Sequence, residues 1–380
     1  MTRKVTILGS TGSVGQSTVK VIQAQGEAFE VQAITANNNV ALLAQQAIAL
    51  NAKCAVIAND VYYDDLKQAL SGTNIGVAAG RQAVVEAAEM PADWIMAAIL
   101  GMAGMEPLMA AIKQGSTVAI ANKEPLVAAG PFVMAAAQEH GTTLLPIDSE
   151  HNAIFQVFEP ENKDSIERII LTASGGPFRE MALEDFGSIT PEQALAHPNW
   201  SMGDKISVDS ATMMNKALEI IEAQRLFDID PEKIEVLVHP QSIVHSMVEY
   251  SDGSILAQMG ASDMCTPITN ALGYPKRLKT PGEKLDFTKI RQLDFEEVDH
   301  KKFPFVQMAY DCLKSGLQSC VAMNAANEMA VQAFLGHKIA FLDIYKLVSQ
   351  TLDRVQPKAL NSLNDVVEYD SFIRSTVDSQ

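Results

Sequence analysis

The sequence predicts an α/β protein with three parts: an N-terminal doubly wound parallel sheet, a central α/β domain and a C-terminal helical domain. Three observations support this fold class. Short β-branched runs alternate with Ala-rich helical stretches over the first 150 residues, strand-like runs continue at wider intervals to about residue 250, and amphipathic, strand-free segments follow from about residue 300. Alternation of strands and helices is typical of a parallel sheet with helices on both faces.

The N-terminal domain is expected over residues 1–149. Between its strands, apolar residues recur at helical spacing, as in NNVALLAQQAIAL (38–50) and EPLMAAIKQ (106–114). The predicted strands are VTIL (5–8), VQAIT (31–35), CAVIA (54–58), DWIMAAI (93–99), STVAIA (116–121) and TTLLPI (142–147).

The central domain is expected over residues 150–273, with an antiparallel or mixed sheet and a helix after residue 209. Its predicted strands are RIILTAS (168–174), IEVLVHP (234–240) and SIVHSMVEY (242–250). A polar stretch rich in Pro and Lys predicts a linker over 274–299. The remaining residues, 300–380, are expected to form the helical domain.

Composition limits the partners and the compartment. With 29 Lys and Arg against 46 Asp and Glu, the net charge of −17 argues against a nucleic-acid-binding surface. The four cysteines form no CxxC pair and indicate buried or incidental thiols in a reducing compartment. The start of the chain leaves no room for a signal peptide, and the weakly polar run 95–105 is too short to span a bilayer. We therefore expect a soluble cytoplasmic protein that binds neither nucleic acid nor membranes.

The segment GSTGSVG (9–15) lies where the first strand should turn into a helix. Glycines at such a turn let the backbone approach a pyrophosphate, and the helix N-terminus offers free N–H groups to it. The spacing G-x-x-G-x-x-G differs from the common G-x-G-x-x-G, so a tight turn without a ligand remains the alternative. Thr11 and Ser13 add hydroxyls that can bind phosphate or cap the helix.

The end of the second strand indicates which dinucleotide binds. NAD sites usually place Asp or Glu there to bind the ribose 2′-hydroxyl. Here the segment reads ITANNNV (34–40) and has no acid. An acid would repel a 2′-phosphate, so its absence favours NADP(H), with Asn37, Asn38 and Asn39 as neutral donors.

Two carboxylates follow the sixth predicted strand. In an extended segment Asp148 and Glu150 point to the same side, while Ser149 points the other way and could reach a substrate. Two like charges on one face are costly unless a cation lies between them. The alternative is a solvated strand end.

A third carboxylate lies on the helix predicted after residue 209. Asn215, Lys216 and Glu219 fall near one face of this helix. Together with Asp148 and Glu150, Glu219 would complete a hard-oxygen site suited to Mg²⁺ or Mn²⁺. The alternative is a surface Lys–Glu pair.

Two further segments suggest phosphate binding and a mobile cover. TASGGPFRE (172–180) offers a Ser-Gly-Gly turn after a strand, which can bind phosphate through backbone N–H groups and a hydroxyl. AHPNWSMG (196–203) holds His197 and Trp200 in a loop-like context. It is read either as part of a lid over residues 174–204 or as an ordinary loop with Trp200 packed on the core.

These segments together resemble the 1-deoxy-D-xylulose 5-phosphate reductoisomerase family, the NADPH- and metal-dependent enzymes of the non-mevalonate isoprenoid pathway. The resemblance covers residues 4 to about 354 and does not depend on one motif. The segments are GSTGSVG, ANKE (121–124), PIDSEHNAIFQ (146–156), TASGGPFR (172–179), HPNWSMG (197–203), KISVDSATMMNKALE (205–219) and AMNAANE (322–328).

The resemblance implies a Rossmann-like NADPH domain, a catalytic domain that binds metal and substrate, and a homodimer. The reaction would be a metal-dependent intramolecular rearrangement followed by NADPH-dependent reduction to 2-C-methyl-D-erythritol 4-phosphate. The metal, Mg²⁺, Mn²⁺ or Co²⁺, would be held by Asp148, Glu150 and Glu219, which together with Lys123 form the catalytic set. Substrate contacts would come from Lys123, Ser149, Glu150, Ser174, His197, Trp200, Ser210, Asn215, Lys216 and Glu219. Cofactor contacts would come from Thr11, Gly12, Ser13, Val14, Asn37, Asn38, Asn39, Asn122, Glu124 and Gly203.

One departure from the family concerns the cofactor. Where the family usually has Gly-Lys/Arg-Asn after the second strand, this chain has Asn37-Asn38-Asn39, without the basic partner for a 2′-phosphate.

Two other functions remain open from the residues alone. One is an ordinary two-domain NADP-dependent dehydrogenase without the rearrangement, and the other is an NADP(H)-binding sensor without catalysis.

Overall fold

A computed structural model describes residues 2–200 and 202–378 of the chain. The chain divides into two compact units. Unit 1 comprises Met1–Pro125, Val133–Phe155 and Asp263–Lys284, and unit 2 comprises Leu126–Phe132, Gln156–Ser262 and Leu285–Gln380. Within the part that the structure describes, no helix is both long and apolar enough to cross a membrane.

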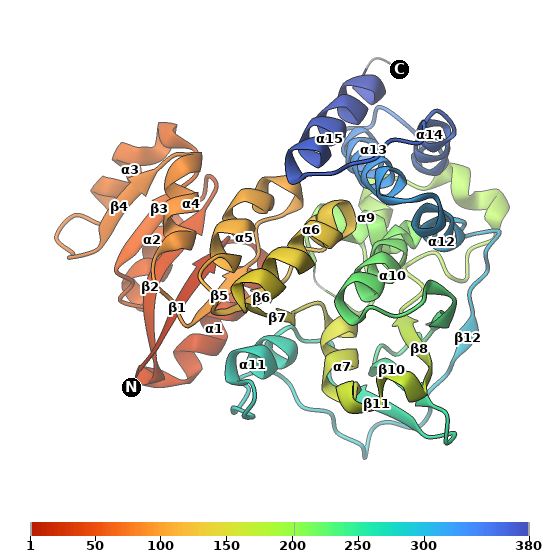
Figure 1. Ribbon diagram of the computed structural model, residues 1–380, viewed down its shortest axis with the longest axis horizontal. Coiled ribbons are helices and arrows are strands. Elements are labelled where there is room, and N and C mark those ends of the chain that lie inside the picture. Colours follow the sequence, from red (N-terminus) through yellow and green to blue (C-terminus); the bar gives the residue numbers. More distant parts are fainter. Residues whose placement is uncertain (1, 201, 379–380) are drawn as a thin grey trace. The chain divides into compact units, whose positions relative to one another are not determined.

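Unit 1 contains a parallel sheet of seven strands with helices packed on it, as the sequence predicts (Figure 1). The strand order is β4-β3-β2-β1-β5-β6-β7, and every neighbouring pair runs parallel. The strands are β1 (Arg3–Leu8), β2 (Phe29–Ala36), β3 (Cys54–Ile57), β4 (Gly76–Ala79), β5 (Trp94–Ala97), β6 (Thr117–Ile120) and β7 (Thr143–Pro146). The six predicted strands are confirmed, and β4 is an additional strand at the sheet edge.

The helices of unit 1 cover a sheet whose central strands are buried on both faces. Val5, Ile7, Ile34, Trp94 and Met96 are all fully buried, as expected for parallel strands between two helical layers. The helices are α1 (Ser13–Ala24), α2 (Val40–Ala49), α3 (Tyr63–Ala69), α4 (Arg81–Glu89), α5 (Met105–Ile112), α7 (Ser149–Val157) and α11 (Cys265–Gly273), with α6 (Glu124–His140) running through both units.

Helix α11 reaches unit 1 from far along the sequence. It packs against α1, and its last turn accepts two hydrogen bonds from the sheet. Arg3 Nη1 donates to the carbonyl of Leu272 (2.5 Å), and the indole Nε1 of Trp94 donates to that of Ala271 (3.2 Å). These bonds satisfy a buried Trp N–H and join the segment 263–284 to the first strand of the chain.

Unit 2 contains a mixed five-stranded sheet in the order β11-β10-β8-β9-β12. The β8–β9 pair is parallel and the other pairs are antiparallel, which confirms the predicted mixed sheet. The strands are β8 (Ile166–Ala173), β9 (Ile234–Val238), β10 (Val244–Tyr250), β11 (Ile255–Met259) and β12 (Glu296–Glu297). The sequence analysis did not predict β11 or β12.

Helices make up the rest of unit 2, including the predicted helical C-terminal part (Figure 1). They are α8 (Pro191–Leu195), α9 (Asp204–Thr212), α10 (Met214–Phe227), α12 (Phe305–Ser315), α13 (Leu317–Leu335), α14 (Phe341–Asp353) and α15 (Leu363–Asp378). Helix α13 is buried over most of its length rather than on one amphipathic face, because α9, α12, α14 and α15 all pack against it.

Candidate functional site

The glycine loop joins β1 to α1 in unit 1. Gly9 has a φ of +86°, and Gly12 lies at the N-cap of α1 without a side-chain capping hydrogen bond. The loop is fixed to β2, because Gly9 N donates to Thr35 Oγ1 (2.9 Å) and Ser10 N donates to Thr35 O (2.7 Å). Gly12 and Ser13 are exposed, and Thr11 and Val14 are half-buried. The start of α1 is therefore open to a ligand.

The three asparagines follow β2, directly beside this loop. Because β1 and β2 are adjacent parallel strands, their carboxyl ends lie at the same edge of the sheet. Asn39 caps α2 by accepting a hydrogen bond from Leu42 N (3.1 Å), and Asn38 Oδ1 accepts one from Asn59 Nδ2 (3.3 Å). All three asparagines are exposed. Asn39, one of the predicted neutral donors, thus also caps the start of α2, a role that the sequence analysis did not predict.

The ANKE segment follows β6, at the same edge of the sheet. Asn122, Lys123 and Glu124 are almost fully buried, and Lys123 lies at the N-cap of α6. The ammonium of Lys123 forms an ion pair with Asp148 Oδ2, where the next strand, β7, has ended. The positive charge of a buried lysine therefore compensates the negative charge of Asp148, one of the predicted metal ligands.

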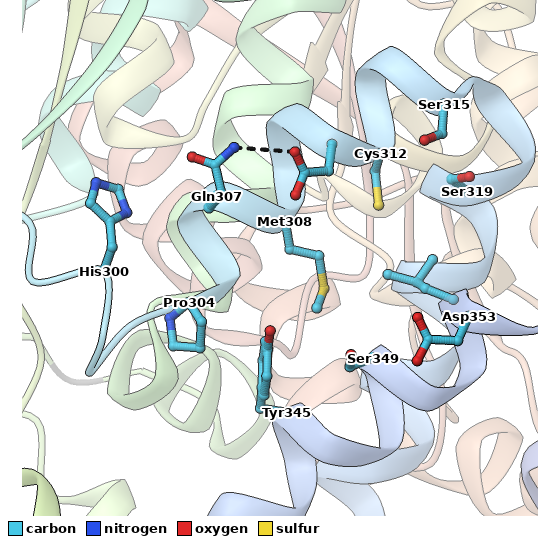
Figure 2. Close-up of a pocket in the computed structure, with 12 residues that line it drawn as sticks. His300, Pro304, Gln307, Met308, Cys312, Ser315, Ser319, Tyr345, Ser349 and Asp353 are labelled. Atoms are coloured by element: carbon cyan, nitrogen blue, oxygen red, sulfur yellow. Dashed lines mark hydrogen bonds between the residues drawn. The ribbon is translucent and has the colours of Figure 1, made fainter.

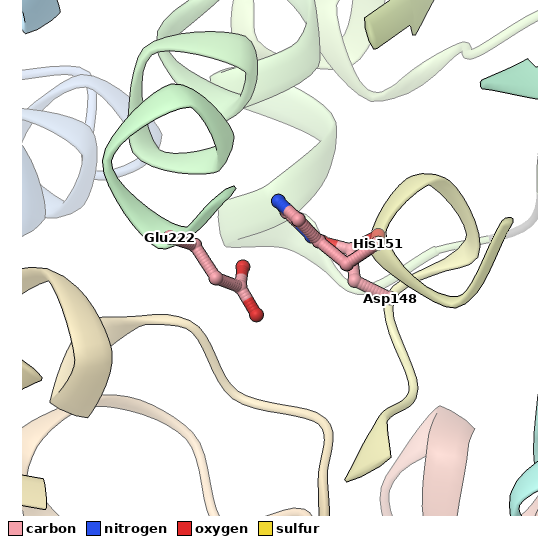
Figure 3. Close-up of side chains that lie close together, drawn as sticks. All are labelled: Asp148, His151 and Glu222. Carbon is pink, nitrogen blue, oxygen red and sulfur yellow. The ribbon is translucent and has the colours of Figure 1, made fainter. Parts of the chain in front are cut away.

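The predicted extended segment from Asp148 to Glu150 is wrong. Helix α7 begins at Ser149, and the carbonyl of Asp148 accepts the helical hydrogen bond from Asn152 N (2.8 Å). The two carboxylates still converge, because each offers an oxygen within 4.8 Å of the other. Ser149 Oγ donates to Glu150 Oε2 (2.5 Å). Figure 3 shows Asp148 beside His151, whose Nδ1 lies 3.9 Å from Asp148 Oδ2.

In unit 2, the Ser-Gly-Gly turn directly follows β8. Gly175 and Gly176 have φ values of +82° and +68°, and Gly176 N donates to Ser174 Oγ (3.1 Å). A Cβ at Gly176 would lie 2.7 Å from the carbonyl oxygen of Ser210, so this turn packs closely on the last turn of α9. Glycine is required here both for the backbone conformation and for the close approach. The packing brings Ser174 and Ser210, both half-buried, into one region.

His197 is fixed by its neighbours in one tautomer. Its Nδ1 accepts hydrogen bonds from Asn199 N (3.2 Å) and Trp200 N (3.0 Å), so the ring proton is placed on Nε2. Nε2 lies 3.0 Å from Ser174 Oγ and donates to it. Burial lowers the pKa of His197, which favours the neutral ring that this arrangement needs.

The side chain of Asn199 also connects the predicted lid segment to the rest of unit 2. Asn199 Nδ2 donates to the carbonyl of Pro240 (2.7 Å) and to Ser242 Oγ (3.2 Å). Trp200 is half-buried, with its ring 6.1 Å from that of the buried His245. Gly203 is exposed at the N-cap of α9, and Ser201 lies outside the described residues.

The predicted helix after residue 209 is two helices. Met213, with a φ of +63°, separates α9 from α10. Asn215, Lys216 and Glu219 lie at the start of α10, as predicted, but the pair is not on the surface: Lys216 is 3% exposed and Glu219 is 0% exposed. Lys216 Nζ donates to the carbonyl of Thr172 (2.6 Å) and pairs with Glu219 Oε2, and Asn215 Nδ2 donates to Glu219 Oε1.

Two polar residues of unit 2 were not predicted as functional. Asp209 is 1% exposed, pairs with Lys205 (2.7 Å) and accepts a hydrogen bond from Asn327 Nδ2 (2.9 Å). Asp209 lies in DSATMMNK and Asn327 in AMNAANE, two segments that carry the family resemblance. The sequence analysis assigned no role to either residue.

A cavity of about 470 Å³ lies among α12, α13 and α14 (Figure 2). Its lining includes His300, Asp311, Cys312, Tyr345 and Asp353. None of the predicted site residues lines it, so this cavity is separate from the predicted substrate and cofactor groups.

Comparison with known proteins agrees with this organisation. The family model described as 1-deoxy-D-xylulose 5-phosphate reductoisomerase matches residues 5–130, and models of the C-terminal domains of the same enzyme match 144–227 and 259–376.

Individual relatives match over nearly the whole chain. The reductoisomerase of Zymomonas mobilis is 58% identical over 372 residues, which covers 98% of this chain and 96% of the relative. That of Rhodospirillum centenum is 56% identical, with 98% and 92% covered. A Zymomonas mobilis structure in complex with NADPH has a TM-score of 0.94 at 54% identity, covering 100% of this chain and 99% of that one. A reductoisomerase in complex with NADPH, fosmidomycin and magnesium has a TM-score of 0.95 at 38% identity, with 99% and 98% covered. The chain therefore belongs to the 1-deoxy-D-xylulose 5-phosphate reductoisomerase family.

Proposed function

We infer that the protein converts 1-deoxy-D-xylulose 5-phosphate to 2-C-methyl-D-erythritol 4-phosphate in isoprenoid precursor biosynthesis. The substrate skeleton rearranges within one molecule to a branched aldehyde, and a hydride from NADPH then reduces that aldehyde. One structural observation carries this proposal beyond family membership. Unit 2 gathers hydroxyl, amide and ammonium groups at the Ser174 turn and the start of α10, and this set suits a phosphate ester.

The phosphate site would use neutral donors around one buried cation. Ser174, Ser210 and Asn215 are half-buried and Lys216 is buried, so a phosphate would meet donors already desolvated by the protein. His197 Nε2–H would donate to the phosphate from the lid segment, and Trp200 would cover the substrate. We propose that the segment 174–204 closes in this way.

The proposed metal site would combine three carboxylates. The donor chemistry fits a hard divalent cation, because Asp148 and Glu150 each offer an oxygen within 4.8 Å of the other. Lysines already balance the charge of two proposed ligands, Lys123 at Asp148 and Lys216 at Glu219. We propose that Asp148, Glu150 and Glu219 hold Mg²⁺, Mn²⁺ or Co²⁺, which when bound supplies Lewis-acid polarisation of the substrate ketone and adjacent hydroxyl.

The other proposed catalytic groups orient the substrate. Lys123 is preorganised by its N-cap position on α6 and would donate to substrate hydroxyls, which stabilises negative charge on oxygen. Ser149 and Glu150, in the first turn of α7, would contact the same oxygens. Because these groups are fixed by helix starts and buried ion pairs, little reorganisation is needed when the substrate binds.

For the cofactor, we propose that NADPH binds at the carboxyl edge of the unit 1 sheet. Thr11, Gly12, Ser13 and Val14 would face the pyrophosphate, and Asn37 to Asn39 would offer neutral donors to the 2′-phosphate. Asn122, Glu124 and Gly203 would complete the contacts. In this proposal residues 1–149 are the NADPH domain, 150–273 the catalytic domain, 274–299 the linker and 300–380 the helical domain.

We also propose a cytoplasmic homodimer. The edge strand β11 supports the dimer, because Ile255 and Leu256 are 48% and 37% exposed on a strand that pairs on one side only within the described residues. An open apolar edge is a surface to which a second copy can add a strand.

Consumption of NADPH tests the function directly. We expect loss of NADPH absorbance with 1-deoxy-D-xylulose 5-phosphate and Mg²⁺ or Mn²⁺, and formation of the branched product. Absence of turnover with every divalent metal would exclude the assignment. Reduction of simple aldehydes without rearrangement would favour an ordinary dehydrogenase.

The metal role has a separate test. Glu219→Gln should lose most of the turnover while NADPH still binds, because the amide is a poor ligand for a hard cation. Glu235→Gln, on the strand β9 and paired with Arg168, is the matched control and should stay near wild type. Similar turnover in the two variants would contradict the role of Glu219.

A further inference from the structure

We propose that Asn327 of α13 is a positioning residue for the substrate phosphate and acts through Asp209 of α9. The inference rests on the proposed function, because it assumes that Ser210, Asn215 and Lys216 contact the phosphate. Neither Asn327 nor Asp209 would touch the substrate.

The first observation is the buried pair itself. Asn327 is 0% exposed and Asp209 is 1% exposed, and Asn327 Nδ2 donates to Asp209 Oδ1 at 2.9 Å. The second oxygen, Oδ2, lies 2.7 Å from Lys205 Nζ. An ionised carboxylate accepts only, so the amide must present its nitrogen to Asp209. One oxygen of this buried carboxylate is thus bound from α13 and the other by a lysine one turn earlier on α9 itself.

The second observation is the position of Asp209 in α9. It directly precedes Ser210, and Thr212 Oγ1 donates to its carbonyl (3.2 Å) just before the left-handed residue Met213. Successive residues of a helix point about 100° apart, so holding Asp209 toward α13 also fixes the direction of Ser210. The Asn327–Asp209 hydrogen bond also fixes the end of α9. Helix α10, which carries Asn215 and Lys216 in its first turn, follows directly.

The third observation is the firm support behind Asn327. Directly after Asn327 in α13, Glu328 pairs with Arg374 of α15 (2.7 Å). Arg374 also pairs with Asp370 (2.7 Å). Helix α13 is buried along most of its length, so it cannot readily rotate to follow a displaced α9. The AMNAANE segment therefore serves as the fixed side of the contact.

The test exchanges the two partners. Asn327→Asp keeps the shape and places a carboxylate against that of Asp209. We expect its KM for 1-deoxy-D-xylulose 5-phosphate to rise about tenfold, because a buried polar contact is lost, with kcat and the KM for NADPH nearly unchanged. The double variant Asp209→Asn/Asn327→Asp restores an amide–carboxylate pair and should recover most of the affinity. Its amide oxygen at 209 can still accept from Lys205.

The matched control lies one turn earlier on the same helix. Asn324 is also 0% exposed, but it bonds to Glu328, so Asn324→Asp puts the same charge into α13 without touching Asp209, and Glu328 keeps its ion pair with Arg374. It should keep the substrate KM of the wild type. Equal KM values in Asn324→Asp and Asn327→Asp, or no recovery in the double variant, would overturn the inference.

A second readout does not require turnover. Inorganic phosphate at tens of millimolar should raise the melting temperature of the wild type and of Asn324→Asp, but not that of Asn327→Asp. Absence of turnover in the wild type would count against the proposed function alone, whereas equal phosphate stabilisation in all three proteins would count against Asn327. Asn327→Ser, which adds no charge, replaces Asn327→Asp in both assays if that variant does not fold.

Discussion

Gly15 is the position in the glycine loop where one methyl group should be least tolerated. It lies inside α1, and a Cβ there would be 2.2 Å from the carbonyl oxygen of Gly9 and 2.6 Å from two backbone atoms of Ser10. All three atoms belong to the backbone, so no side-chain rotation can relieve the clash. Gly12 differs, because its Cβ would be 3.6 Å from Gly9 O, which is ordinary contact.

The expected cost of Gly15→Ala follows from two opposing effects. Overpacking costs about 3 kcal/mol at the upper end of its usual range, and replacing a helical Gly with Ala returns about 1 kcal/mol. The net loss is therefore about 2 kcal/mol, which corresponds to roughly a 6 °C fall in Tm for a unit of this size. Gly12→Ala at the N-cap should cost less, about 0.5–1 kcal/mol, because Ala is a poorer N-cap residue than Gly.

Tryptophan fluorescence can assign the loss to unit 1. The chain has two tryptophans, and Trp94 is fully buried on β5, paired with Val5 of β1. In a Trp200→Phe background, Trp94 alone reports thermal unfolding. We expect Gly15→Ala to lower this transition by more than Gly12→Ala, which should mainly weaken NADPH binding. An unchanged transition in Gly15→Ala would refute the steric argument.

Two further predictions concern unit 2. Tyr250→Phe removes a hydroxyl that donates to Val157 O (2.9 Å) and accepts from Glu159 N (2.9 Å), so the free energy of unfolding measured in urea should fall by about 1–2 kcal/mol; no change would show that water replaces both bonds. His197 should titrate below its ordinary pKa of 6.5, because burial disfavours the charged ring. The free energy that the neutral ring of His197 contributes to holding its loop is therefore complete above pH 6.5. This contribution is lost as the pH falls through the lowered pKa of His197. NMR titration of the ring protons, assigned with His197→Gln, checks this, and a pKa at or above 6.5 would contradict it.

The first sheet was largely predictable because its central strands are continuous β-branched and apolar runs. The missed strand β4 reads GVAA, and Gly and Ala carry little strand preference, so its pairing with β3 decides its conformation. The missed strand β11 is a partly exposed edge strand, and such strands lack the buried run on which the prediction depends.

The site shows a similar division between near and distant residues. The spacing of Asn215 and Glu219 predicts their contact because one helix turn joins them. Asp148 and Glu150 were also expected to converge, but the chain brings them together at a helix start rather than in a strand. Asp209 and Asn327 are 118 residues apart, and no periodicity relates them. Only the packing of α13 on α9 creates that contact.

The return of α11 to unit 1 has a consequence for synthesis of the chain. The first sheet is complete once β7 has emerged, but the carbonyls that bind Arg3 and Trp94 belong to residues 271 and 272. Much of unit 2 must therefore leave the ribosome before unit 1 has all of its parts. Closing a contact across 269 residues also carries a large entropic cost. The growing chain thus holds an unfinished N-terminal unit, with the indole of Trp94 lacking its partner, until the segment 263–284 arrives.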